Sequence, residues 1–144
     1  MSKSGVAEAK IMVVEDNAML LGLLQRALER AGYEVIPVLS GSEMMQRLQQ
    51  DRPDLIVLDI ALPDSDGRDL LAAMKKDPRT FSVPVVVWSG RYADSDRAIV
   101  LDLGAEDYVE KGPPSGLVPK IERVLLRISE RELAAARKTI EPKA

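Results

Sequence analysis

Short apolar runs alternate with longer amphipathic segments along most of the chain. Four runs have the length and composition of buried strands: Ile11–Val14, Leu55–Leu58, Val85–Trp88 and the weaker Tyr108–Val109. Tyr33–Leu39 is a fifth, less uniform candidate. Runs that are apolar almost throughout are typical of parallel strands covered on both faces, so we expect a sheet of this kind.

The segments after these runs carry apolar residues at helical spacing. We expect five helices, built on these positions: Leu20, Leu24 and Leu28; Met44, Met45 and Leu48; Leu70, Leu71 and Met74; Ile99, Val100 and Leu103; Leu117, Ile121, Val124, Leu125 and Ile128. Gly32 is a plausible left-handed cap for the first helix, and Ser40 with Glu43 has the spacing of a capping box for the second. Strand and helix therefore alternate five times, which predicts an α/β fold, a doubly wound five-stranded parallel sheet.

The chain of 144 residues is long enough for one domain. We expect an N-terminal extension over residues 1–9, the folded domain over 10–128, and a helical C-terminal extension or the start of a linker over 129–144. The last stretch keeps helix formers such as Glu132–Lys138 but loses its apolar stripe.

Composition excludes several kinds of chemistry and partner. The formal net charge is −3, so no overall basic field attracts nucleic acid, and direct nucleic-acid binding is not expected. The chain has no cysteine and no histidine, which excludes disulfides, thiolate or imidazole metal ligands and a histidine base. No apolar run approaches the ~20 residues that span a bilayer, and the first ten residues lack the apolar stretch of a signal peptide. We expect a cytoplasmic protein without membrane contact.

Polar side chains directly follow four of the predicted strands: Glu15, Asp16, Asp59, Ser89 and Lys111. The carboxyl ends of parallel strands lie on one edge, and ligand sites of open α/β sheets lie at that edge where the strand order reverses. The second strand ends without a charge at Leu39–Ser40, as an outer strand would. We therefore expect the first and third strands to be adjacent and these polar groups to converge.

Three converging carboxylates repel one another by roughly 1 kcal/mol per pair at 4 Å in water, and by more in a protein. A pocket of oxygen ligands suits Mg²⁺, which often shares its shell with a phosphoryl oxygen. Lys111 would add a second positive charge and Ser89 a hydroxyl donor. Phosphoryl transfer needs positioning and charge neutralisation of this kind, so Asp59 is the predicted nucleophile and would form an acyl phosphate.

Over about Lys10–Ile128 the chain resembles the receiver domain of bacterial two-component response regulators. The motifs that carry the resemblance, in order, are Glu15–Asp16, Asp59 with Pro63 and Gly67, Ser89–Gly90, and the segment GAEDYVEK that ends at Lys111. The resemblance implies a flavodoxin-like (βα)5 fold with strand order 2-1-3-4-5.

The resemblance also implies a role for each residue of the site. Asp59 would accept a phosphoryl group from a phosphohistidine on a sensor histidine kinase or a histidine phosphotransfer protein. Mg²⁺, or Mn²⁺ in its place, would be held by Glu15, Asp16, Asp59 and the backbone carbonyl of Ala61. The phosphoryl group would be bound by Ser89, Gly90 and Lys111. Ser89 and Tyr108 would act as the switch, biasing the surface of the fourth helix, fifth strand and fifth helix toward a downstream effector. Some receivers also form homodimers through this surface.

Two features depart from the family pattern. Gly112 follows Lys111 where the family commonly has proline, and Pro113 comes one residue later. A cis bond before Gly112 would cost ~2.5–4 kcal/mol, so either the loop is strained or Lys111 is held differently. The two positions that tune the lifetime of the phosphoryl group in this family are occupied here by Ala61 and Arg91. Ala61 cannot orient an attacking water, and we expect slow self-dephosphorylation.

Other interpretations of these residues exist. Acidic residues after strands are common turn formers and helix caps, and Asp64 and Asp66 are interpreted in this way. Trp88 is assigned to the core. An aspartyl phosphatase of the haloacid dehalogenase type would have aspartate at the place of Ala61, and Glu15–Asp16 would repel the phosphate of a flavin cofactor. The expected protein is thus not an enzyme but a phosphoacceptor with self-catalysed phosphorylation. A receiver-like adaptor that acts only by docking stays open as the alternative.

Overall fold

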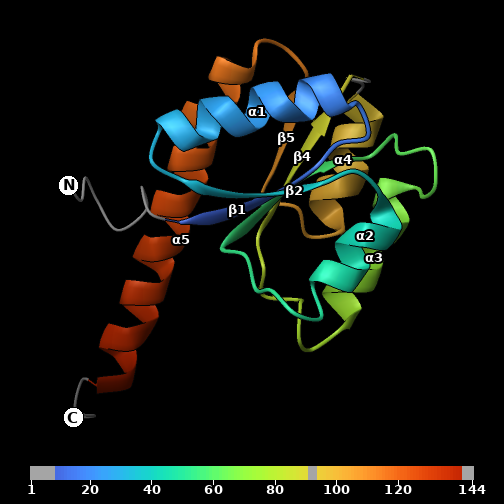
Figure 1. The fold of residues 1–144 in the computed structure, drawn as a ribbon. Coiled ribbons are helices and arrows are strands. Elements are labelled where there is room, and N and C mark those ends of the chain that lie inside the picture. Colours follow the sequence, from blue (N-terminus) through green and yellow to red (C-terminus); the bar gives the residue numbers. More distant parts are fainter. Residues whose placement is uncertain (1–8, 91–93, 141–144) are drawn as a thin grey trace.

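A five-stranded parallel sheet forms the centre of the computed structural model, which describes residues 9–90 and 94–140 (Figure 1). The strands are β1 (Lys10–Val14), β2 (Glu34–Val38), β3 (Leu55–Asp59), β4 (Val85–Ser89) and β5 (Asp107–Glu110). They lie in the order β2-β1-β3-β4-β5, which confirms the order implied by the resemblance. β1 and β3 are therefore adjacent at the point where the strand order reverses.

Helices cover both faces of the sheet. Within the described residues, α1 (Ala18–Arg30) and α5 (Leu117–Ile140) pack on one face, and α2 (Gly41–Arg47), α3 (Gly67–Lys76) and α4 (Asp94–Asp102) pack on the other. Figure 1 shows the two layers on either side of the strands. The predicted doubly wound α/β architecture is confirmed.

Alternation along the strands divides the interior into two cores. Successive side chains of a strand point to opposite faces. In β1, Met12 and Val14 join the core under α2, α3 and α4, whereas Ile11 and Val13 join the core under α1 and α5. Trp88 of β4 belongs to the α1/α5 core and is 1% exposed, as its assignment to the core predicts. The same alternation decides on which face a polar residue after a strand comes to lie.

Polar side chains begin three of the helices close to the strand ends. Asn17 caps α1 by accepting a hydrogen bond from the Leu20 amide, and Asp66 caps α3 by accepting one from Arg68. Ser40 caps α2 by accepting from the Glu43 amide at 3.1 Å. The Glu43 carboxylate accepts from the Leu39 amide at 2.9 Å, one residue before the position that an ideal capping box uses.

The loop between β3 and α3 is tied to the beginning of α2. The Asp64 carboxylate accepts hydrogen bonds from the backbone amides of Gly41, at 3.0 Å, and Ser42, at 3.1 Å. These backbone hydrogen bonds lower the pKa of Asp64. Asp64 thus acts as a cap supplied from a distant loop, and its interpretation as a structural residue is confirmed, as is that of Asp66.

Helix α5 begins at the first of its predicted apolar positions, Leu117, and ends beyond the last of them, Ile128. A 3₁₀ turn at Pro114–Gly116 precedes it, and the helix continues past Ile128 to Ile140 with residues 129–138 exposed. The continuation consists of strong helix formers, and the Arg131 guanidinium meets the Glu106 carboxylate at 2.6 Å, which fixes it to the body. None of the described helices has an apolar stretch long enough to cross a bilayer.

Gly67 lets the first turn of α3 approach the end of β3. Its amide donates to the Ile60 carbonyl at 3.0 Å. A Cβ at Gly67 would collide with the Ile60 Cα and lie 2.9 Å from the Asp59 carbonyl oxygen, both of which are backbone atoms. Only glycine permits this approach without movement of the strand that carries Asp59.

We predict that Gly67→Ala lowers the free energy of unfolding by about 2 to 3 kcal/mol, because the new methyl group displaces backbone. Gly22→Ala is the matched control. Nothing lies within 4 Å of a Cβ at Gly22, in the middle of α1, so this change should stabilise the protein by about 0.5 to 1 kcal/mol. Urea unfolding of both variants measures the difference. Equal effects would contradict the close approach at Gly67.

Candidate functional site

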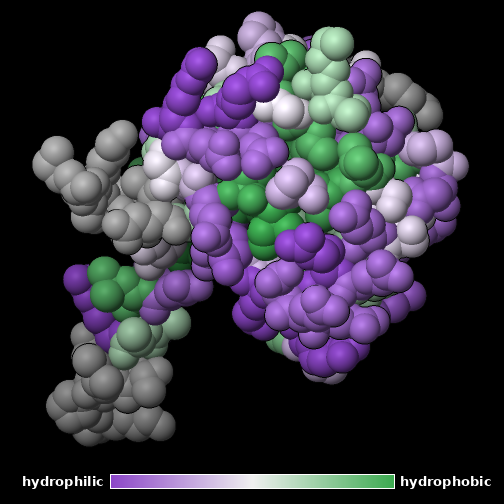
Figure 2. All heavy atoms as spheres, viewed as in Figure 1, coloured by the Kyte–Doolittle hydropathy of each residue, from purple (hydrophilic) through white to green (hydrophobic). Residues whose placement is uncertain are grey.

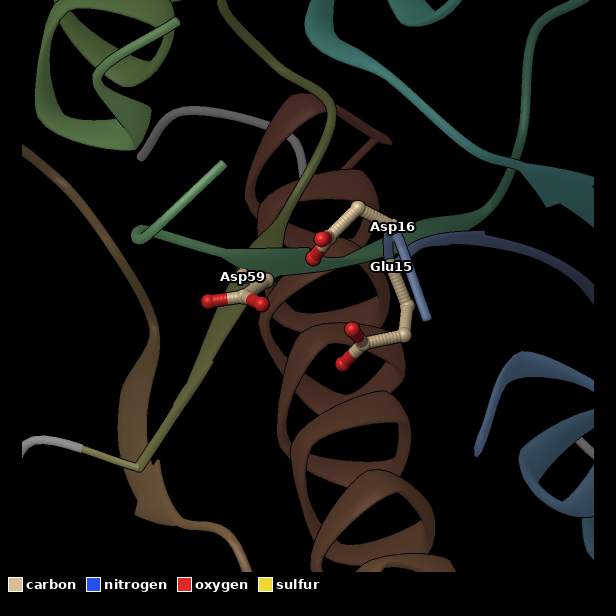
Figure 3. Close-up of side chains that lie close together, drawn as sticks. All are labelled: Glu15, Asp16 and Asp59. Atoms are coloured by element: carbon tan, nitrogen blue, oxygen red, sulfur yellow. The ribbon is translucent and has the colours of Figure 1, made fainter. Parts of the chain in front are cut away.

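Three carboxylates meet at the carboxyl edge of the sheet. Glu15 and Asp16 follow β1, and Asp59 is the last residue of β3. One carboxylate oxygen from each lies within 4.8 Å of the other two, and Figure 3 shows the three side chains side by side. Glu15 is 1% exposed and Asp59 is 2% exposed, whereas Asp16 lies at the surface. The adjacency of β1 and β3 produces the predicted convergence.

Lys111 joins two of these carboxylates. Its ammonium nitrogen lies 2.8 Å from Glu15 Oε1 and 2.9 Å from Asp59 Oδ2. The Lys111 amide donates to the Ser89 carbonyl at 2.8 Å, so the residue is held against the end of β4. Three carboxylates and one ammonium leave two negative charges uncompensated at the site.

The lysine reaches the site without a cis peptide bond. All described peptide bonds are trans, including the bond from Lys111 to Gly112. Partial burial lowers the pKa of Lys111, but hydrogen bonds and charge attraction from Glu15 and Asp59 outweigh it, so this pKa is raised above its usual value. The ammonium therefore stays charged at neutral pH.

Neutral donors complete the support of the two buried carboxylates. Asp59 Oδ1 accepts from the Ala61 amide at 2.9 Å, and Glu15 Oε2 accepts from the Asn17 amide at 3.1 Å. The indole nitrogen of Trp88 donates to Glu15 Oε1 at 3.3 Å. Every carboxylate oxygen of Glu15 and Asp59 thus has a donor.

The sequence pattern does not predict the contact between Trp88 and Glu15, since it places Trp88 only in the core. A signal was available in the strand alternation. Glu15 comes two residues after Val13 and lies on the same face of the sheet, toward the α1/α5 core that contains Trp88. Trp88 is therefore both a core residue and a support for the carboxylate cluster.

The structure places the other predicted site residues around the same edge. Ser89 is fully buried at the end of β4, and a Cβ at the exposed Gly90 would lie 3.8 Å from Lys111 Cδ. Tyr108 of β5 is 2% exposed and packs in the core under α2, α3 and α4. Arg91 lies outside the described residues.

This arrangement is suited to binding a hard cation together with an anionic group next to it. An oxygen-only cluster with excess negative charge is the donor set that Mg²⁺ and Mn²⁺ prefer. An ammonium group beside one carboxylate can neutralise an incoming phosphoryl oxygen. Glu15 and Asp59 both contact Lys111, and of these two only Asp59 is itself the last residue of a strand.

Comparison with known proteins decides the family. The sequence pattern of the response regulator receiver domain matches residues 11–122. The chain belongs to the response regulator receiver domain family. The alkaline phosphatase synthesis transcriptional regulatory protein PhoP of Bacillus subtilis is 36% identical over 121 residues, which are 84% of this chain and 50% of that protein. The chain spans about half the length of the curated relatives it matches.

Solved structures of receiver domains have the same fold. A CheY-like response regulator receiver domain protein from Methanospirillum hungatei has a TM-score of 0.79 and 26% identity, covering 86% of this chain and 98% of that one. The Mn²⁺-bound form of response regulator Rcp1 has a TM-score of 0.67 and 31% identity, covering 81% of this chain and 89% of that one. The receiver fold and its acidic pocket are thus established for this chain.

We predict opposite effects on stability from the two partners of the Lys111–Asp59 contact. In metal-free buffer, Asp59→Asn should raise the free energy of unfolding by about 1 to 3 kcal/mol, because it removes one of two uncompensated charges. Lys111→Met should lower it by about 3 kcal/mol, because two buried carboxylates lose their ammonium.

Urea unfolding without divalent cations measures both changes, and Asp102→Asn provides the control. Asp102 is an exposed aspartate at the end of α4, and its replacement should change the free energy by less than about 0.5 kcal/mol. A loss of stability in Asp59→Asn would mean that Lys111 already compensates the cluster fully.

Proposed function

We propose that Asp59 accepts a phosphoryl group from a phosphohistidine of a sensor histidine kinase or a histidine phosphotransfer protein, in the cytoplasm. The observation that carries this proposal is the contact of the buried Asp59 with Lys111 at 2.9 Å, beside two further carboxylates. Membership of the receiver family supports it. The protein would be a signalling phosphoacceptor with self-catalysed phosphorylation and not a turnover enzyme.

A divalent cation would be held by Glu15, Asp16, Asp59 and the backbone carbonyl of Ala61. The donor set supports this assignment, since all ligands are oxygens and the cluster carries excess negative charge. The solved Mn²⁺-bound form of the response regulator Rcp1 supports Mn²⁺ as an alternative to Mg²⁺. When bound, the cation supplies charge neutralisation to the phosphoryl oxygens. Glu15 already has three donors, so Asp16 and Asp59 offer the freer oxygens.

The chain's own residues position the two reacting groups. An oxygen of Asp59 attacks the phosphorus, an oxygen–phosphorus bond forms, and the bond from phosphorus to the histidine nitrogen breaks, with its electron pair leaving on that nitrogen. Lys111, the Ser89 hydroxyl and the Gly90 amide would contact the transferred group.

The output surface would be that of α4, β5 and α5. Ser89 would bond the phosphoryl group, and Tyr108, whose ring lies inward, would report the change at this surface. A cavity of about 430 Å³ lies there, and its lining is mostly charged: Arg97, Asp107, Tyr108, Val109, Glu110 and Lys120. A downstream effector protein or domain with complementary charges is the proposed target.

We predict that incubation with a small phosphodonor and Mg²⁺ adds the mass of one phosphoryl group to the protein, and that Asp59→Asn abolishes this addition. Lys111→Met should reduce the extent by at least about tenfold, because an oxyanion partner is lost. Intact-protein mass spectrometry measures all three.

The emission of Trp88 provides an independent readout. Trp88 is the single tryptophan of the chain and lies 3.3 Å from Glu15, so beryllofluoride, which mimics the phosphoryl group, should change its fluorescence with Mg²⁺ present. Asp59→Asn is the control that should not respond. An unchanged mass together with unchanged emission would favour an adaptor that acts only by docking.

We predict a long-lived phosphoryl group. Ala61 stands two residues after Asp59 and carries no group that could orient a water for attack. Ala61→Asn introduces such a group at an exposed position and should shorten the half-life several-fold. The decay of phosphoprotein after removal of the donor measures it, with Ala73→Asn at an exposed position of α3 as the control. A wild-type half-life of seconds would contradict this role of Ala61.

A further inference from the structure

The distal part of α5, residues 126–140, extends beyond the body of the domain (Figure 1). Isolated helical segments of this length are marginal in water, and most helices are stabilised by burying an apolar face. Residues 129–138 are exposed, and Figure 2 shows a hydrophobic patch on this projecting part. The helix therefore presents apolar surface that no described residue covers.

The exposed residues repeat with the period of a coiled coil. Leu126 is 49% exposed and Leu133 is 53% exposed, and seven residues separate them. Ser129 and Ala136, three residues after each leucine, fill the fourth position of the same heptads, which is the second core position of a coiled coil, and both are exposed. In the sequence, Ile140 follows Leu133 after seven more residues. Leucines at the first core position with small residues at the second core position form a narrow seam along one side of a helix.

This seam lies away from the body of the domain. Helical geometry turns it by roughly a third of a turn from the side that carries Ile121 and Val124, which are buried against the sheet, and the buried Leu125 lies between the two. Arg131 contacts Glu106 on a different side of the helix, and so leaves the seam open. A second helix could lie along the seam without meeting the domain to which α5 belongs.

One pair of charges beside the seam is complementary to a second copy of the same helix. In a parallel pair, each residue just before a first heptad position faces the residue five places later on the other helix. Glu132 is such a residue, and five places later comes Arg137. Because a two-fold symmetric dimer contains each such contact twice, it would have two pairs of these opposite charges. We propose that residues 126–140 of α5 form a parallel two-stranded coiled coil between two copies of this chain.

The interface is small. Two heptads with serine and alanine at the second core position bury much less surface than the roughly 1,600 Å² of a stable standard-size interface. The dimer is therefore weak and depends on concentration. The inference concerns a surface distinct from the α4, β5 and α5 face and does not rest on phosphorylation.

Sedimentation velocity of the full chain, without metal or phosphodonor, tests the proposal over a range of concentrations. The wild type should show a concentration-dependent equilibrium between monomer and dimer, and Leu133→Asp should be monomeric throughout. Ala135→Asp is the matched control, because it adds the same charge on the other side of the helix and should leave the dimer in place. A monomeric wild type, or a dimer that survives Leu133→Asp, would overturn the proposal.

Charge reversal tests the parallel orientation. Glu132→Arg and Arg137→Glu should each weaken dimerisation several-fold, since each places like charges opposite one another, and the double variant should restore the wild-type dissociation constant to within about twofold. Failure of the double variant to recover would exclude this pairing.

Cross-linking keeps the test independent of dimer strength. The chain has no cysteine, so a single introduced thiol can pair only with its copy. Under mild oxidation, Ser129→Cys and Ala136→Cys should both give disulfide-linked dimers, which requires a parallel helix pair in register, whereas Ala135→Cys should not. Equal cross-linking of all three would indicate random collision and contradict the proposal.

Discussion

The contact of the Lys111 ammonium with Glu15 and Asp59 is the interaction on which the site depends. Both carboxylates are buried, and burying a charge without a partner costs several kcal/mol. The three residues stand at the ends of β1, β3 and β5, so their contact requires the strand order that the sheet has. Topology and electrostatics are thus mutually dependent, since another strand order would leave these groups apart.

The compensation by Lys111 is incomplete, so the cluster keeps an excess of negative charge of the kind that suits a divalent cation. A fully neutral cluster would stabilise the fold more, but it would bind a divalent ion weakly. The protein instead retains excess negative charge at one edge, next to the exposed Asp16, while apolar packing on both faces of the sheet holds the strands in place. Functional sites commonly depart from the most stable local arrangement in this way.

The elements that the sequence predicts well are those whose signal is local and periodic. Apolar runs identify the strands, and the polar residues that follow them identify Asp59 and its neighbours before any coordinates are known. The support of Glu15 by Trp88 could not be predicted from composition, because it depends on the strand order, in which only β3 separates β1 from β4. For residues 129–144 the sequence left a helical extension and the start of a linker as alternatives, because an apolar stripe marks burial and not helix. Glu132–Lys138 are helical without being buried.

The long-range cap formed by Asp64 has a mechanical consequence. The segment after Asp59 is bonded on one side to the start of α2 through Asp64, and on the other side to α3 through Asp66 and the close approach of Gly67. The loop is therefore held between two helices, α2 and α3. A displacement of the loop after Asp59 would therefore have to disturb its contacts with both α2 and α3.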